Sequence, residues 1–326
     1  MSVRQWLWLT LLATFWGSAF ILMAIALPTF PPLVIVTGRM CVAAIVLNGV
    51  LITQHLHSQP VRSQSITPQP SQPRHHLYPS SLSLWLQCGG LSLLGNLLPF
   101  GLVVWAQQHI TASLASILIA AAPIFTVVLA VFIAGERLTL VRALGITLGF
   151  SGVVVLIGPD VLQGFSLQGA GELAILGAAM SYALSGFWGR RFKHLPPQLV
   201  STMTVTMGSL IILPLCLAAI ATNRLQITTV SLHSWPLSAI FAVIALGVFS
   251  TALAYLIYYR LLAEVGVVKT SLVSFLVPFC ALILGTTLLN EQLDAAALLG
   301  MALILSGLAV LDGRLLRPLS LNRRAK

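Results

Sequence analysis

The sequence predicts an all-α integral membrane protein with ten transmembrane helices, arranged as two inverted five-helix repeats. Composition is the first observation behind this prediction. Of the 326 residues, 58% are hydrophobic and 7% are charged, and the mean hydropathy is +0.98. A soluble domain carries roughly a quarter of charged residues, so this chain lacks the charge to coat a water-facing surface. Composition therefore excludes a soluble enzyme, a secreted disulfide scaffold and a disordered protein.

Segmentation is the second observation. The apolar runs are continuous and do not alternate at every second residue, which favours helices over a transmembrane barrel. Most approach or exceed the roughly 20 residues that a membrane-spanning helix needs. The first run follows Arg4 and is longer than the apolar core of a signal peptide, so we interpret it as an uncleaved first span. The ten predicted spans lie near 5–26, 32–52, 82–106, 111–134, 141–158, 169–190, 198–220, 236–259, 267–289 and 295–312.

An internal repeat is the third observation. Six positions recur with the same separation of 155 residues, and the two halves lie near 1–160 and 165–326, with five spans each. An odd number of spans turns the second copy upside down relative to the first. Inverted repeats with a substrate site between them at the membrane midplane are typical of secondary transporters. The recurring pairs are Ser116 and Ser271, Pro123 and Pro278, Glu136 and Glu291, Thr139 and Asp294, Gly145 and Gly300, and Gly152 and Gly307.

The basic residues predict the orientation. All but two of the 17 Lys and Arg residues fall on one side of the predicted spans, the exceptions being Arg224 on the other side and Arg39 inside the second span. The positive-inside rule then predicts that both termini, including a basic C-terminal tail, lie in the cytoplasm. The protein is thus expected to be a multi-pass protein of the cell (inner) membrane. Segment 53–81 is rich in Pro, Ser and Gln and is predicted to be a disordered cytoplasmic loop. Nucleic-acid binding is not expected, because the basic residues form no single soluble face.

Two long segments carry a family resemblance. They are TASLASILIAAAPIFTVVLAVFIAGERLTLVRALGITLGFSGVVVL in the first half and VVKTSLVSFLVPFCALILGTTLLNEQLDAAALLGMALILSGLAVL in the second. The sequence resembles the drug/metabolite transporter (DMT) superfamily, in particular EamA-type ten-helix transporters. The resemblance covers nearly the whole chain except 53–81. It implies membrane transport and metabolite export, with cargo such as amino acids, while the motif itself does not specify the cargo.

Candidate substrate-binding residues are polar or aromatic groups at depth. Arg39 is the charged residue well inside a span, and burying it costs at least about 2.5 kcal/mol; a structural role and carboxylate binding both stay open. Trp16 and Tyr182 lie too deep for the interfacial aromatic belt, and Pro123 and Pro278 are expected to kink their helices where the cavity forms. The predicted substrate-binding set is Trp16, Arg39, Asn96, Tyr182, Ser185, Tyr255 and Ser274. Aromatic residues predicted at the interface instead are Trp6, Trp8, Trp85, Trp235 and Tyr259.

Glu136 and Glu291 are predicted to cap helices or fasten loops, in preference to coupling protons. Each stands three residues before Thr139 or Asp294, and both of these are good N-caps. Glu172, about a turn into the sixth span, is the nearest alternative for proton coupling.

The function that these patterns favour is secondary transport. We expect the export of small organic metabolites, such as amino acids or related amphipathic compounds, by alternating access at a midplane cavity. The alternatives are a transporter or flippase for lipids, sugars or nucleotide conjugates, and a membrane-embedded enzyme. An enzyme is not expected, because all seven acidic residues fall in loops or near helix ends. No cofactor or metal is expected, since the four cysteines show no CxxC spacing. The expected partners are a small-molecule substrate and the lipid bilayer, and a homodimer stays open.

Overall fold

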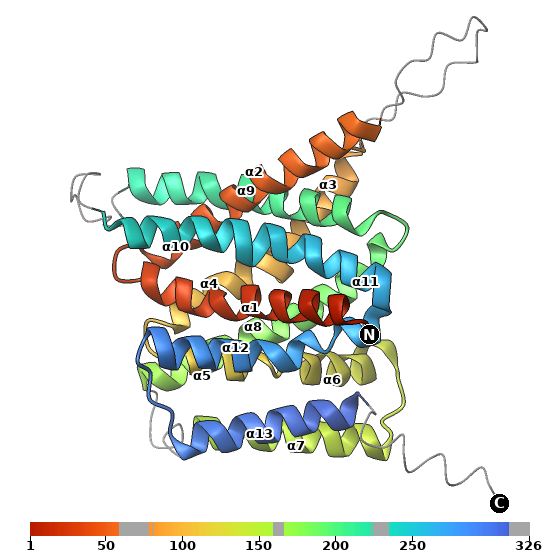
Figure 1. The fold of residues 1–326 in the computed structure, drawn as a ribbon, viewed down its shortest axis with the longest axis vertical. Coiled ribbons are helices and arrows are strands. Elements are labelled where there is room, and N and C mark those ends of the chain that lie inside the picture. The colour runs from red at the N-terminus through yellow and green to blue at the C-terminus, as the bar shows by residue number, and fades with distance from the viewer. Residues whose placement is uncertain (59–77, 80, 159–165, 223, 225–234, 313–326) are drawn as a thin grey trace, which may run out of the picture.

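The helices form one bundle in which they run roughly parallel or antiparallel to one another (Figure 1). The computed structural model describes residues 1–326 except 59–77, 80, 159–165, 223, 225–234 and 313–326. Within this described part, eight helical runs are long and apolar enough to cross a membrane, and two shorter apolar helices, Val273–Leu288 and Ala295–Leu311, complete the ten predicted spans.

The two repeats follow the same helix order. In each, the third span is interrupted by a short π-helical turn, and the chain breaks again within or at the start of the fourth span. The first repeat consists of α1 (Val3–Ala26), α2 (Pro32–Ser58), α3 (Leu82–Ser92), η1 (Leu93–Leu97), α4 (Leu98–Ala106), α5 (Ala112–Ile119), α6 (Ala122–Ala134) and α7 (Leu140–Ile157). The second consists of α8 (Leu167–Gly189), the 3-10 turn η3 (Arg190–Phe192), α9 (Pro197–Ala221), α10 (Leu237–Gly247), η5 (Val248–Leu253), α11 (Ala254–Thr270), α12 (Val273–Leu288) and α13 (Ala295–Leu311).

Three predictions concern the connections between spans. The predicted loop 53–81 begins too early, because α2 stays helical to Ser58; residues 59–77 and 80 lie outside the described part. The division of the halves near 160–165 and the basic tail from 313 onward also lie outside the described residues.

Side-chain caps explain where many of the helices begin. In each case a hydroxyl or carboxylate accepts a hydrogen bond from the backbone amide three residues ahead, which satisfies one of the amides that the first helical turn leaves free. The caps predicted at Thr139 and Asp294 are confirmed. The capping residues are Ser2, Ser81, Thr111, Thr139, Ser166 and Asp294.

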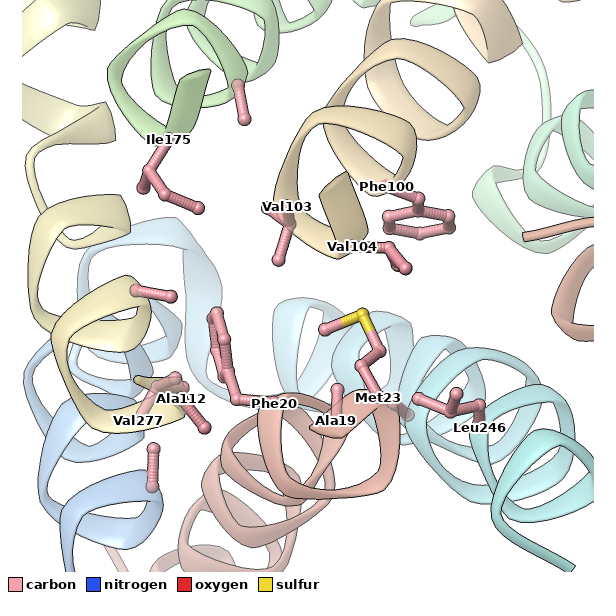
Figure 2. Packing of buried hydrophobic residues seen from close by; sticks show 14 of the residues in the cluster. Ala19, Phe20, Met23, Phe100, Val103, Val104, Ala112, Ile175, Leu246 and Val277 are labelled. Atoms are coloured by element: carbon pink, nitrogen blue, oxygen red, sulfur yellow. The ribbon is translucent and has the colours of Figure 1, made fainter. Parts of the chain in front are cut away.

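The repeats interlock through their first helices. α1 packs against α10, α11 and α12 of the second repeat, whereas α8 packs against α4, α5 and α6 of the first. Figure 2 shows Phe20 and Met23 of α1 in this core, with Val277 of α12 and Leu246 of α10 close to the same helix. Helices α1 and α8 are therefore each inserted into the opposite half.

Helices α7 and α13 lie side by side at one edge of the bundle (Figure 1). A Cβ placed on Gly307 would come within 2.6 Å of the carbonyl oxygen of Gly145, and one on Gly152 within 2.6 Å of that of Gly300. The offset of 155 residues relates Gly145 to Gly300 and Gly152 to Gly307, so it exchanges the two contacts and maps this antiparallel interface onto itself. Small residues let these backbones touch. This geometry is what two inverted repeats require.

Candidate functional site

A cavity of about 910 Å³ lies in the middle of the bundle and is lined by both repeats. It brings together all the predicted substrate-binding residues and both predicted kink prolines, although they come from six helices and one π-helical turn far apart in sequence. The nine are Trp16, Arg39, Asn96, Pro123, Tyr182, Ser185, Tyr255, Ser274 and Pro278.

The proline pair stands beside breaks in the fourth and ninth spans. In the first repeat the helix breaks after Ile119, and Pro123 is the second residue of α6, a position that needs no backbone N–H donor. In the second repeat the break lies between Thr270 and Val273, and Pro278 sits inside α12. The fourth and ninth spans are otherwise equivalent, but their helix breaks do not fall at positions that the repeat relates. Ser116 and Ser271, a second recurring pair, also line the cavity.

Arg39 is held in the cavity wall by residues of both repeats. Arg39 is 5% exposed as a whole residue. Its Nε donates a hydrogen bond of 2.8 Å to Oγ1 of Thr251, and its guanidinium carbon lies 3.6 Å from the centroid of the Phe100 ring. A hydrogen bond and a cation–π contact offset part of the cost of taking this charge out of water. They leave the two terminal nitrogens without a hydrogen-bond partner among the described residues.

Asn96 has the hydrogen-bond partner that a buried amide side chain requires. The hydroxyl of Tyr255 donates to Oδ1 of Asn96 at 2.7 Å, and Nδ2 of Asn96 lies 3.5 Å from the hydroxyl of Ser92. Asn96 belongs to η1 and Tyr255 to α11, so this bond also joins the repeats. The π-helical turns widen the third and eighth spans at equivalent positions and aim Asn96 and Thr251 into the centre, as such turns often do at functional sites.

The aromatic side of the cavity centres on Trp16. Its ring centroid lies 5.6 Å from that of Tyr258. Tyr182 and Ser185 face the cavity from α8, where the Ser185 hydroxyl donates to the Tyr182 carbonyl at 2.8 Å. The interfacial position predicted for Tyr259 is wrong, because this half-buried ring lines the cavity beside Tyr258. A ring near a helix end suits either place, and packing with its neighbours puts it inside.

Sequence reasoning missed four further residues of the site. Phe100 and Thr251 contact Arg39. Ser250 and Thr204 are buried hydroxyls that line the same cavity; among the described residues Ser250 has no hydrogen-bond partner, and Thr204 lies at the thiol of Cys88. The repeat offset of 155 residues pairs Thr251 with Asn96 and could have found it. The other three carry no signal in the sequence.

The cavity extends toward one end of the bundle. We call this the termini end, because α1 begins there and α13 finishes there (Figure 1). The lining includes Leu311 and Asp312 at the end of α13, and Val200 near the start of α9. At the opposite end, which we call the far end, the repeats are joined by Glu291.

Glu291 fastens the loop before α13 to the start of α5. One carboxylate oxygen accepts from the amide of Ala112 at 2.8 Å, and the other accepts from the amide and the hydroxyl of Ser113 at 3.0 and 2.5 Å. Its counterpart Glu136 at the termini end instead forms an ion pair of 2.8 Å with Arg142, and both side chains are partly exposed. The predicted loop-fastening role thus agrees with both geometries, which differ between the two ends.

Two stretches of the chain match one family model. The model of the EamA-like transporter family aligns with residues 4–158 and again with residues 169–311. The chain belongs to the EamA-like transporter family. Membership makes it a multi-pass membrane transporter with a small-molecule substrate, and not an enzyme.

Individual relatives of this EamA-like transporter are distant. It is 28% identical over 295 residues to a chloroplastic WAT1-related protein of Arabidopsis thaliana, covering 89% of this chain and 65% of that protein, less than two thirds of its length. It is 31% identical over 200 residues to a probable amino-acid metabolite efflux pump of Salmonella typhimurium, covering 61% of this chain and 67% of that one. A solved crystal structure with 19% identity superposes with a TM-score of 0.58 over 95% of this chain and 97% of its own, which shows the shared fold.

Proposed function

We propose that this EamA-like protein is a secondary transporter that exports small organic metabolites, such as amino acids or related amphipathic compounds, by alternating access. The observation that carries the proposal is the central cavity, which both repeats line and which extends to the termini end while Glu291 joins the repeats at the far end. A cavity of this size with a few polar groups among aromatic walls suits an amphipathic molecule.

The orientation supports export. The Lys and Arg distribution supports a cytoplasmic location of the termini end. The cavity then faces the cytoplasm, where cargo for export is loaded. Two of the relatives are named as a probable amino-acid metabolite efflux pump and a probable terminal-alkyne amino-acid exporter, which agrees with this cargo class and direction.

Counterflow in proteoliposomes tests the function. Vesicles preloaded with an unlabelled amino acid should accumulate its labelled form for at least some members of an amino-acid panel, whereas empty liposomes should not. A response to an imposed pH gradient would indicate proton coupling, and its absence would indicate exchange or facilitated diffusion. If no panel member moved while a labelled lipid crossed the bilayer, the proposed cargo would be wrong and the flippase alternative would replace it.

A matched pair of tryptophan variants links transport to the cavity. Trp16→Ala removes a ring from the cavity wall, and Trp6→Ala removes an exposed ring from the same helix α1. We expect Trp16→Ala to weaken counterflow at low substrate concentration several-fold, while Trp6→Ala keeps the wild-type rate. Equal rates in both variants, with equal insertion, would remove Trp16 from the binding residues.

A further inference from the structure

Arg39 presents unused hydrogen-bond donors to the cavity. In the described part of the chain, Arg39 and Glu172 are the buried charged side chains, and of the two Arg39 lines the cavity. Its Nε is occupied by Thr251, and its face is occupied by Phe100. The planar fork of the guanidinium matches the two oxygens of a carboxylate. What the protein leaves open on Arg39 is therefore the geometry that binds an organic acid.

Two further donors lie in the same wall. Thr204 is 5% exposed and Ser250 is 1% exposed. The hydroxyl of Ser250 has no hydrogen-bond partner among the described residues, and that of Thr204 lies at the thiol of Cys88, which is a weak partner. A buried hydroxyl without a partner costs free energy, and both hydroxyls line the cavity that Arg39 lines. Ser250 stands next to Thr251 in η5, and Thr204 belongs to α9. Cargo oxygens would satisfy both hydroxyls.

The rest of the cavity offers a neutral surface. Among its described lining residues the other charged group is Asp312, which follows the end of α13 at the termini end, and aromatic rings such as Trp16, Tyr182 and Tyr258 cover much of the wall. A second charge on the cargo would meet neutral acceptors there. The polar part of the cargo is thus expected to be one carboxylate, with an apolar or aromatic body.

We infer that the cargo is an organic acid whose carboxylate binds the terminal nitrogens of Arg39 and the hydroxyls of Thr204 and Ser250, with its apolar body against Trp16 and Tyr258. This inference rests on the proposed function, because it names the chemistry that selects the exported metabolite. Amino acids with aromatic or aliphatic side chains belong to the class, and amides and esters of the same acids, which lack the carboxylate, do not.

The test compares acids with their amides. Binding is measured as ligand-induced thermal stabilisation of the purified protein by 3-phenylpropionate, 3-phenylpropionamide, phenylalanine and phenylalaninamide, and transport is measured as inhibition of counterflow. Charged hydrogen bonds of this kind discriminate by about ten- to a hundredfold. We expect that preference for the acids in the wild type and in Arg224→Gln, which removes a basic residue outside the cavity. The ratio of acid to amide affinity should fall to near one in Arg39→Gln and should be kept in part in Arg39→Lys.

The outcomes separate the inference from the function on which it rests. Amides that bind as tightly as acids in the wild type, or a preference that persists in Arg39→Gln, would overturn the inference while transport itself stood. Acids that bind but are not transported would overturn the proposed function and keep the site. If Arg39→Gln does not fold, the double variant Thr204→Ala, Ser250→Ala keeps the guanidinium, and we expect it to lower the preference several-fold; an unchanged preference would again count against the site.

Discussion

The glycine contacts between α7 and α13 lead to a stability prediction that can be worked from distances. A methyl group added in Gly307→Ala would lie 2.5 Å from the amide nitrogen and 2.8 Å from the Cα of Gly149, and 2.6 Å from the carbonyl oxygen of Gly145. Carbon contacts are optimal at about 3.5–4.0 Å. All three neighbours are backbone atoms, so no side-chain rotamer relieves the clash. The two helices must separate locally by about 1 Å.

The magnitude follows from two opposing effects. Overpacking of a close contact costs about 1–3 kcal/mol, while alanine is up to about 1 kcal/mol better than glycine inside a helix. We therefore expect Gly307→Ala to lose on the order of 1–2 kcal/mol of stability. Its unfolding temperature should fall by on the order of 5 °C. Gly152→Ala should lose a similar amount, because the repeat maps its contacts with Gly300 and Ile304 onto those of Gly307.

The assay is thermal unfolding of detergent-purified variants, followed by tryptophan fluorescence. Gly101→Ala is the matched control, since Gly101 lies inside α4 and a Cβ there meets nothing within 4 Å. It should be as stable as the wild type or slightly more stable. If Gly307→Ala and Gly152→Ala both unfold at the temperature of Gly101→Ala, the close backbone contact does not hold this pair of helices together, and the reasoning fails.

Three other substitutions test the polar contacts of the structure. Tyr255→Phe leaves Oδ1 of Asn96 without its donor, so thermal unfolding should show a loss of about 1–2 kcal/mol, and no loss would mean that water replaces the hydroxyl. Thr251→Val removes the hydrogen-bond acceptor of Nε of Arg39 and should destabilise the protein by about 1.5–3 kcal/mol, whereas Thr251→Ser should recover most of this loss. Equal stability of the Val and Ser variants would contradict the hydrogen bond. Gln107→Leu removes one hydrogen bond to a carbonyl but also a buried oxygen without a partner, so its unfolding temperature should stay near that of the wild type, and a large drop would refute this balance.

The spans and the repeat could be predicted from sequence because their causes are local. A continuous apolar run is enough to place a helix in a membrane. Thr139 and Asp294 cap helices through their own side chains, and Gly145 and Gly152 recur because backbones touch there. Such constraints act on fixed positions of the fold, so both repeats keep them. The end of α2 at Ser58 was missed, because composition marks where a chain turns polar and not where its helix ends.

The cavity was predictable in part for a related reason. Arg39 and Asn96 cannot face lipid without a large cost, so depth alone directs them inward. A single hydroxyl such as Thr204 or Ser250 can bond to its own helix at almost any position in a span, and only the packing of the bundle decides which ones face the cavity. Phe100 is likewise one of many apolar rings in the sequence, and only the structure shows that the Arg39 guanidinium lies over it.

The site combines a symmetric frame with asymmetric side chains. Arg39 and Thr204 each lie seven residues after the proline that begins their helix, and the 155-residue offset pairs Asn96 with Thr251. The frame is shared, yet a cation stands on one side and a hydroxyl on the other. Exchanging two conformations requires only that the backbones be equivalent, whereas binding one end of a cargo molecule requires that the walls differ. The recurring glycines, prolines and glutamates are therefore expected to set the balance between conformations, and residues such as Arg39 that do not recur are expected to set affinity.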